Sequence, residues 1–345
     1  MKMEDSLPER FESVAALEEV MTRPDAALKA DLASLDGDIM VLGAGGKMGP
    51  TLARLAKRAA PEKRVTAVAR FSSAGLRDEL AAHGVETIAC DFLADGALAA
   101  LPDASNIVYM AGAKFGMTGN EPHMWAMNAL VPGLVASRFR ASRIVALSTG
   151  CVYPFVPVES GGPTEETPVG PPPGDYAWSC LARERMFDDG SRRFGTPGRL
   201  IRLNYAIDMR YGVLHDVGRI VHAGRPLDVS MGHVNVIWQG DANSFILRSL
   251  AHATEPTSPL NITGPGTLSV RALAEAFAER FGVTANIVGE EAPTAWLNNA
   301  SAAHALLGTP PVALDTMIDW QADWILRDMP SLGKPTGFEV RDGKF

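Results

Sequence analysis

A glycine-rich segment, VLGAGGKMG at residues 41–49, limits what this chain can fold into more than any other feature. Gly43, Gly46 and Gly49 stand three residues apart, and Pro50 suits the first turn of the helix pattern that follows. Glycines there permit a tight turn and a close approach of the backbone to a phosphate, and the helix offers free N–H groups to it. The segment therefore predicts a strand–loop–helix unit that binds the pyrophosphate of a dinucleotide. A glycine-rich turn in an unrelated α/β domain is the alternative.

Short apolar runs alternate with amphipathic stretches along the rest of the chain. Continuous apolar strands between helices are typical of a parallel sheet that helices cover on both faces. We therefore expect an α/β fold, a doubly wound parallel sheet of the Rossmann type with a smaller, discontinuous substrate lobe. The expected strands are residues 38–43, 64–69, 85–90, 106–112, 142–148, 199–204 and 259–264.

The same pattern predicts how the chain is divided. Residues 1–36 form an N-terminal helical extension, in which Phe11, Val14, Leu17 and Val20 recur at helical spacing. The remaining expected parts are the dinucleotide-binding domain at 37–204, completed by 234–264, the substrate lobe at 205–233 and 265–328, and an extended tail at 329–345.

Composition excludes several classes of partner. A formal net charge of −8 argues against general binding to nucleic acid or to an anionic membrane, and no apolar run approaches the length of a membrane span. Three cysteines at no metal-like spacing are too few for a disulfide framework, and the N-terminus has no apolar signal segment. We expect a protein of the reducing cytoplasm, with no metal site.

The end of the second expected strand bears on the choice of cofactor. An acidic residue there would hold the ribose 2′-hydroxyl of NAD, but the chain has Ala69 and Arg70. Arg70 can meet a 2′-phosphate together with Ser72 and Ser73, which favours NADP within a general expectation of NAD(P). The alternative is that Arg70 stacks on the adenine of either cofactor.

Further motifs follow in a fixed order. AGAKFG at 111–116 follows the fourth expected strand, LSTGCVYP at 147–154 covers the end of the fifth, and LIRLNYAI at 200–207 spans the next. With the glycine segment and Tyr176, they resemble the extended short-chain dehydrogenase/reductase family, the NAD(P)-dependent epimerase/dehydratase group, over roughly residues 37–325. The resemblance implies a nicotinamide cofactor, a small sugar-like substrate and a homodimer.

The resemblance also implies roles for single residues. Thr149 would bind the reacting oxygen, Tyr176 would move its proton, and Lys114 would supply positive charge. The cofactor-binding candidates are Gly43, Gly46, Gly49, Lys47, Met48, Arg70, Asp91, Ala111, Gly112 and Cys180. The substrate-binding candidates are Asn204, His123 and Arg210. For His123 the alternative is packing of its helix, and for Arg210 it is an ordinary solvated side chain.

One position departs from the family pattern Tyr-x-x-x-Lys. The lysine would hold the nicotinamide ribose and lower the pKa of the tyrosine, but the chain has Cys180 there. Without the cation, Tyr176 loses about 2–3 kcal/mol as a base. Three interpretations stay open: Lys114 supplies the charge, the reaction runs with an unassisted Tyr176, or the protein binds cofactor without turnover. For Cys180 itself two interpretations stay open. It is a small, half-buried residue that fills the space left by the lysine, or it is a nucleophile, which is disfavoured because no histidine is adjacent in sequence and Arg183 is the only nearby cation.

Other positions narrow the reaction. Gly150 and Cys151 stand where dehydratases of the family carry carboxylates, so hydride transfer or epimerisation is favoured over elimination. Asn235 falls in the region where nucleotide-sugar enzymes hold the diphosphate with an arginine, which favours a free sugar, sugar acid or lactone. The second hypothesis is a cofactor-binding sensor or structural protein that has lost catalysis.

Overall fold

The structure is a computed structural model that describes residues 7–114, 117, 119–170, 174–334 and 336–341 of the 345-residue chain. Phe115 and Gly116 of the expected nicotinamide loop lie outside the described residues, as do the two ends of the chain. The helices within the described residues are all too short or too polar to cross a membrane.

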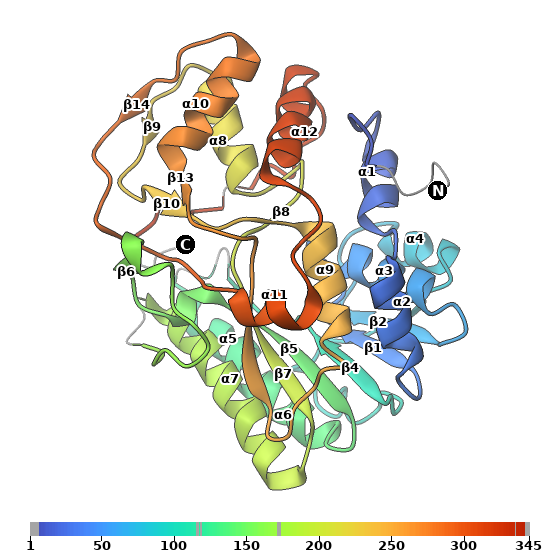
Figure 1. Ribbon diagram of the computed structural model, residues 1–345. Coiled ribbons are helices and arrows are strands. Elements are labelled where there is room, and N and C mark those ends of the chain that lie inside the picture. The colour runs from blue at the N-terminus through green and yellow to red at the C-terminus, as the bar shows by residue number, and fades with distance from the viewer. Residues whose placement is uncertain (1–6, 115–116, 118, 171–173, 335, 342–345) are drawn as a thin grey trace.

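A seven-stranded parallel sheet forms the centre of the molecule (Figure 1). Each of the seven strand predictions corresponds to one of its strands, and the predicted fold class is confirmed. In spatial order the strands are β12 (Ser258–Ile262), β7 (Gly198–Leu203), β5 (Arg143–Thr149), β4 (Asn106–Tyr109), β1 (Ile39–Leu42), β2 (Val65–Ala69) and β3 (Glu86–Ala89). The strand order reverses between β1 and β4, and parallel sheets bind ligands beyond the carboxyl ends of the strands at such a point.

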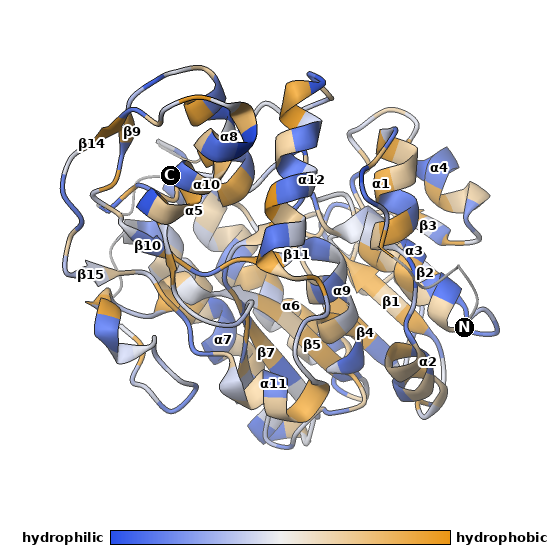
Figure 2. Cartoon of the chain, turned by 45° about the horizontal axis from the view of Figure 1, so that its top comes forward, coloured by the Kyte–Doolittle hydropathy of each residue, from blue (hydrophilic) through white to orange (hydrophobic). Residues whose placement is uncertain are grey.

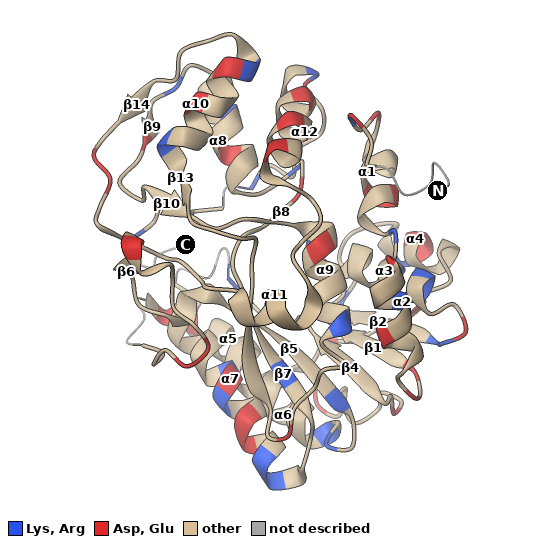
Figure 3. Ribbon diagram, viewed as in Figure 1, with Lys and Arg blue, Asp and Glu red and all other residues tan. Residues whose placement is uncertain are grey.

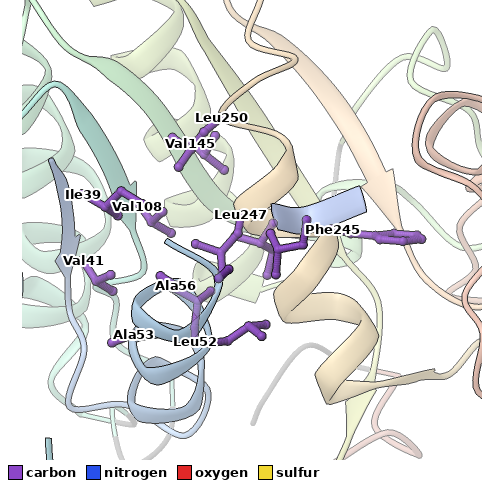
Figure 4. Close-up of a cluster of buried hydrophobic side chains, with 14 of the residues drawn as sticks. Ile39, Val41, Leu52, Ala53, Ala56, Val108, Val145, Phe245, Leu247 and Leu250 are labelled. Atoms are coloured by element: carbon purple, nitrogen blue, oxygen red, sulfur yellow. The ribbon is translucent and has the colours of Figure 1, made fainter. Parts of the chain in front are cut away.

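Helices cover both faces of the sheet, as the apolar strands require. On one face, α2 (Ala26–Ala33), α3 (Gly49–Ala59) and α9 (Gln239–Arg248) pack on the side chains of alternate strand residues. Figure 4 shows Leu52 and Ala56 of α3 beside Leu247 of α9, with Ile39 and Val108 of the sheet next to them. Figure 2 shows the apolar strands enclosed by helices that turn polar residues outward.

The opposite face is covered by a continuous run of helical turns and one long helix. The run is α5 (Glu121–Trp125), a π-helix at Ala126–Leu130 and α6 (Val131–Arg138), and the long helix is α7 (Gly174–Phe194). Phe187 of α7 packs edge-on against Tyr109 of β4 with ring centroids 5.1 Å apart. Figure 3 shows several charged residues along α7. The remaining helices on the sheet are α4 (Leu76–Ala82) and α11 (Ser301–Leu307).

A smaller lobe stands above the carboxyl ends of the strands and has its own apolar core. Its helices are α8 (Val213–His222), α10 (Val270–Phe281) and α12 (Leu314–Leu326). Four short strand pairs lie within or next to this lobe: β8 (Ala206–Ile207) with β11 (Ile237–Trp238), β9 (Leu227–Asp228) with β14 (Ile287–Val288), β10 (His233–Val234) with β13 (Leu268–Ser269), and β6 (Val156–Pro157) with β15 (Thr294–Ala295).

Both terminal segments pack against the folded body. Phe11, before α1 (Val14–Met21), lies 4.7 Å from Trp320 of α12 between ring centroids. Glu18 of α1 pairs with Arg54 of α3 at 2.7 Å. At the other end, the buried Phe338 joins the core of the smaller lobe.

Candidate active site

The glycine segment forms one wall of a cleft at the carboxyl ends of β1, β2 and β4. We call it the glycine cleft, and its volume is about 230 Å³. It is lined by Gly43, Gly45, Gly46, Ala69, Arg70, Phe71, Ser72, Ser73, Leu76, Cys90, Asp91, Phe92, Met110, Ala111, Gly112 and Met127.

Two of the three spaced glycines are required by the backbone. Gly43 has φ of +93°, and an added Cβ would lie 2.4 Å from the Ala111 nitrogen. At Gly49 an added Cβ would lie 2.5 Å from the Ala44 oxygen, so helix α3 could not pack as closely on β1. Gly45 and Gly46, by contrast, are exposed and face the cleft. A bare backbone at the N-terminus of α3 therefore borders an open cleft, which fits the pyrophosphate of a dinucleotide.

The residues predicted to meet the adenosine end lie at the far side of the same cleft. Arg70 is exposed at the end of β2, and Ser72 and Ser73 line the cleft beside it. Asp91, after β3, accepts a hydrogen bond from the Leu93 backbone nitrogen at 3.1 Å. Ala111 and Gly112 line the opposite side, next to β4. These candidates for cofactor contact thus share one cleft, and their roles stay predictions.

A second cleft of about 190 Å³ lies between the sheet and the smaller lobe, and we call it the tyrosine cleft. It brings together all three predicted catalytic residues and one predicted substrate residue. It is lined by Lys47, Met48, Lys114, Ser148, Thr149, Cys151, Tyr176, Leu203, Asn204, Tyr205, Ala206, Tyr211, Gly212 and Thr336. Lys47 and Met48, expected at the cofactor, therefore face the tyrosine cleft and not the glycine cleft.

Thr149 and Tyr176 reach this cleft from different elements. Thr149 ends β5, and its Oγ1 accepts a hydrogen bond from the Cys151 nitrogen at 3.2 Å, which leaves the hydroxyl proton to be donated elsewhere. Tyr176 lies in the first turn of α7. Burial raises the pKa of Tyr176 well above that of a free phenol, and a hydrogen bond that it shares with Cys180 acts in the same direction. Tyr176 is therefore a neutral phenol, suited to donate a proton.

Cys180 does not line either cleft. It lies one turn beyond Tyr176 on α7, is 0% exposed and packs with Val152 and Leu181. Burial raises the pKa of the Cys180 thiol as well, so it is neutral and has little nucleophilic character. The structure places Cys180 as a filler of the helix interface, one of the two interpretations that the sequence left open, whereas its predicted contact with cofactor remains untested.

Two cations surround the phenol at this site. The Lys114 ammonium lies 5.3 Å from the centroid of the Tyr176 ring, and burial lowers the pKa of Lys114. The Arg183 guanidinium is buried under the loop after β4, where an added Cβ on Gly112 would lie 2.5 Å from its Nη2. Its positive charge lowers the pKa of Tyr176, against the larger effect of burial. Both lysine and arginine thus stand near the position that the family pattern gives to its lysine.

The π-helix explains how Arg183 is held. It places Asn128 so that its Oδ1 accepts hydrogen bonds from Arg183 Nη2 at 2.6 Å and from the Ala113 nitrogen at 2.9 Å. Asn128 Nδ2 donates to the Ala113 oxygen at 2.8 Å, and Arg183 Nη1 donates to the Leu147 oxygen at 2.9 Å. A single buried amide thereby fixes the loop after β4 to α7. The sequence indicated Arg183 only as a cation near Cys180 and did not predict its contact with Asn128.

Asn204 is held by a chain of amides beneath the tyrosine cleft. Its Nδ2 donates to Asn235 Oδ1 at 3.3 Å, and the same oxygen accepts from the Asn298 nitrogen at 2.8 Å. Asn235 stands in the region where nucleotide-sugar enzymes have an arginine for the diphosphate, and in this structure its buried amide orients Asn204. Sequence reasoning missed Asn298, since nothing in its neighbourhood in the sequence marks it.

Two predicted substrate residues lie elsewhere. Arg210 pairs with Asp208 at 2.7 Å and with Glu18 of α1 at 2.8 Å, and it lines neither cleft. Its charge ties the N-terminal extension to the smaller lobe, and its expected contact with substrate stays a prediction. His123, on α5, also lines neither cleft.

Comparisons with known proteins agree with this arrangement. Residues 39–207 match the model of the NAD dependent epimerase/dehydratase family, and no curated protein matches the chain. Similar solved structures include MoeE5 with UDP-glucose and NAD (19% identity, 85% of this chain and 99% of that chain, TM-score 0.68). A second is UDP-glucuronic acid 4-epimerase from Bacillus cereus with UDP-glucuronic acid and NAD (17% identity, 84% of this chain and 99% of that chain, TM-score 0.70). A third is DesIV, a dTDP-glucose 4,6-dehydratase from Streptomyces venezuelae, with NAD and TYD (19% identity, 84% of this chain and 97% of that chain, TM-score 0.70). At such identities the likeness establishes the shared fold.

Proposed function

Because residues 39–207 belong to the NAD dependent epimerase/dehydratase family, we propose that this protein is a nicotinamide-dependent epimerase or reductase of a sugar or sugar-derived substrate. The observation that carries the proposal is the meeting of Thr149, Tyr176 and Lys114 in one cleft, next to the cleft under the glycine segment. Relatives of the same fold hold NAD together with nucleotide sugars.

The chemistry required of the chain is modest. In the direction of reduction, a substrate carbonyl gains a hydride at carbon and a proton at oxygen, and it becomes a hydroxyl group. The nicotinamide, when bound, supplies the hydride. The Thr149 hydroxyl donates a hydrogen bond to the reacting oxygen, and Tyr176 donates the proton that this oxygen gains. Oxidation of a hydroxyl group reverses these transfers.

The protonation state of Tyr176 bears on which direction runs faster. Since burial raises the pKa of Tyr176, the phenol is present in its neutral form across the physiological range. A neutral phenol can donate a proton at once, whereas it must first lose one to act as a base. Arg183 opposes the effect of burial on this pKa by its positive charge. We therefore expect efficient carbonyl reduction at neutral pH and an oxidation rate that rises with pH.

The test replaces Tyr176 by phenylalanine. We expect kcat to fall by about 10²- to 10⁴-fold with an unchanged affinity for the cofactor, because only the proton donor is removed. Tyr109→Phe is the matched control, since Tyr109 is buried against Phe187 and lines neither cleft. Carbonyl reduction by Tyr176→Phe at the parental rate would refute the mechanism. Cofactor binding with no turnover of any sugar would instead support the second hypothesis of a binding protein.

The finer choice of cofactor rests on the adenosine end of the glycine cleft. Arg70, Ser72 and Ser73 favour NADP, and the chain lacks an acidic residue at the end of β2. Arg70→Gln should weaken NADPH binding about tenfold and leave NADH binding unchanged in a fluorescence titration. An equal loss for both would mean that Arg70 stacks on adenine.

A homodimer in the cytoplasm completes the proposal. Exposed apolar side chains lie on neighbouring helical turns on the outer side of α6 and α7: Leu130 (55%), Leu134 (44%), Trp178 (43%) and Met186 (38%). Such a group suits a surface that a second copy covers. Sedimentation equilibrium of the parent and of a Leu134→Glu variant would test it, since a monomeric parent contradicts the assembly.

A further inference from the structure

We propose that the substrate carries a carboxylate, and that the ammonium group of Lys47 binds it. This inference rests on the proposed function, because it assigns the substrate class of the tyrosine cleft. A small anionic sugar derivative, a sugar acid, is thereby favoured over a neutral sugar.

The first observation is the direction of the Lys47 side chain. Its backbone belongs to the glycine segment, yet its ammonium crosses to the smaller lobe and donates to the Ala206 oxygen at 2.9 Å. It also lies 4.5 Å from the centroid of the Tyr211 ring. Gly45 and Gly46 line the glycine cleft, whereas Lys47 lines only the tyrosine cleft. The ammonium is therefore placed for what occupies the second cleft and not for the pyrophosphate.

The second observation is the charge of the tyrosine cleft. Its described lining contains two lysines, Lys47 and Lys114, and no aspartate or glutamate. The acidic group nearest in sequence to Ala206 and Tyr211 is Asp208, and its charge is already paired with Arg210 at 2.7 Å. A second carboxylate lies directly behind the lining, because Asp216 accepts a hydrogen bond from Thr336 Oγ1 at 2.6 Å. The described lining itself carries positive side chains and no negative ones, in a chain whose net charge is −8. An anion entering it gains from both ammonium groups.

The third observation is that burial makes the charged form of the Lys47 ammonium less favourable. Burial lowers the pKa of Lys47 to about 8, although Asp208 raises it in part, and burial lowers the pKa of Lys114 as well. A bound carboxylate would restore the charged form of Lys47 by replacing lost solvation. Of the three donors of its ammonium, the bond to Ala206 uses one, which leaves others for a ligand.

A carboxylate is favoured over a phosphate by the shape of the site. The cleft measures about 190 Å³, and under the proposed function it receives the reacting ends of both the cofactor and the substrate. Its described lining contains no arginine for bidentate binding of a phosphate. A sugar phosphate shares the anionic chemistry, so the experiment includes it.

The test compares three hexoses that differ only at carbon 6: D-glucuronate, D-glucose and D-glucose 6-phosphate. Binding of each to the chain saturated with cofactor is measured by calorimetry, and turnover is measured in parallel. We expect D-glucuronate to bind at least tenfold more tightly than either of the others. Lys47→Met should weaken D-glucuronate binding by at least tenfold more than it weakens D-glucose binding, and Lys47→Arg should keep part of the preference for D-glucuronate. Lys29→Met, an exposed lysine on α2, is the control.

Each outcome decides a different statement. Equal binding of D-glucuronate and D-glucose, or an unchanged affinity for D-glucuronate in Lys47→Met, overturns the inference. A loss of cofactor affinity in Lys47→Met also overturns it, because Lys47 would then serve the pyrophosphate. Tighter binding of D-glucose 6-phosphate than of D-glucuronate would mean that the cleft prefers a phosphate, and it overturns the inference that the substrate carries a carboxylate. Lys47-dependent binding of D-glucuronate without any hydride transfer supports the inference while the proposed function fails.

Discussion

Replacing Cys180 by lysine, the residue of the family pattern, is expected to damage the fold and not to restore a faster site. Cys180 is 0% exposed and packs with Val152 and Leu181 in the interface between α7 and the loop after β5. Arg183, one turn further along α7, already fills the neighbouring space with a buried guanidinium that Asn128 and the Leu147 oxygen hold. A lysine at 180 would bring a second cation into the same interior.

The magnitude follows from the helix geometry. Side chains three apart on a helix have Cβ atoms about 5–6 Å apart. Two unit charges at about 6 Å repel each other by about 3 kcal/mol at an effective dielectric constant of about 20. Burying an ammonium adds a cost of several kcal/mol unless the lysine side chain reaches the tyrosine cleft. The sum is a large share of a typical unfolding free energy of about 5–15 kcal/mol.

Guanidinium denaturation of four proteins measures this coupling: Cys180→Lys, Arg183→Met, the double variant and the parent. We expect Cys180→Lys to lose about 3 kcal/mol or more, and the double variant to recover about 3 kcal/mol relative to the sum of the single changes. Cys180→Ala, which removes the thiol without adding charge, should cost about 1 kcal/mol. If Cys180→Lys is as stable as Cys180→Ala and turns over faster than the parent, lysine and Arg183 do not compete, and the reasoning is wrong.

Three other buried groups give measurable expectations. Glu184→Gln breaks a buried pair with Arg202 at 2.7 Å and should cost about 3–5 kcal/mol in urea denaturation, whereas Asp188→Asn in an exposed pair should cost less than about 1 kcal/mol. Burial raises the pKa of Asp241 to about 7 from 3.8, so the folded chain binds the proton more tightly and its stability falls as pH rises between these values. Asp241→Asn should remove that fall and be more stable than the parent at pH 8, by at most about 4 kcal/mol. Because the pKa of Lys47 is about 8, kcat/KM for D-glucuronate should fall above that pH while kcat/KM for D-glucose does not; parallel profiles would contradict this.

The sheet was predictable because its central strands are buried on both faces. β1, β2 and β4 have no exposed residue, so each reads as a continuous apolar run that only a covered parallel strand explains. The glycine segment was predictable for a similar reason, since Gly43 and Gly49 leave no space for a side chain. Local sequence carries both signals in full.

The side-chain contacts of the site were not predictable, because they join segments far apart in the chain. Arg210 and Glu18 are separated by 192 positions, and nothing near either residue shows that one neutralises the other. Arg183 and Asn128 meet across 55 positions through a π-helix that no local pattern revealed. The direction of Lys47 depends on the Ala206 oxygen, 159 positions away. Sequence patterns thus placed residues near the site, whereas the fold decided which cation serves which purpose.

The cysteine in place of lysine is therefore weak evidence that catalysis has lapsed. If the site had decayed, mutation would be free to fill its clefts, to leave Thr149 and Tyr176 facing apart, or to place carboxylates among the lysines. The structure has the opposite features: both clefts are open, both hydroxyl residues line the same one, and its described lining has no carboxylate. Burial raises the pKa of Tyr176, and the positive charge of Arg183, one turn beyond Cys180 on the same helix, offsets part of that rise. A cation at a new position can thus favour loss of the phenol proton while residue 180 serves as a neutral filler.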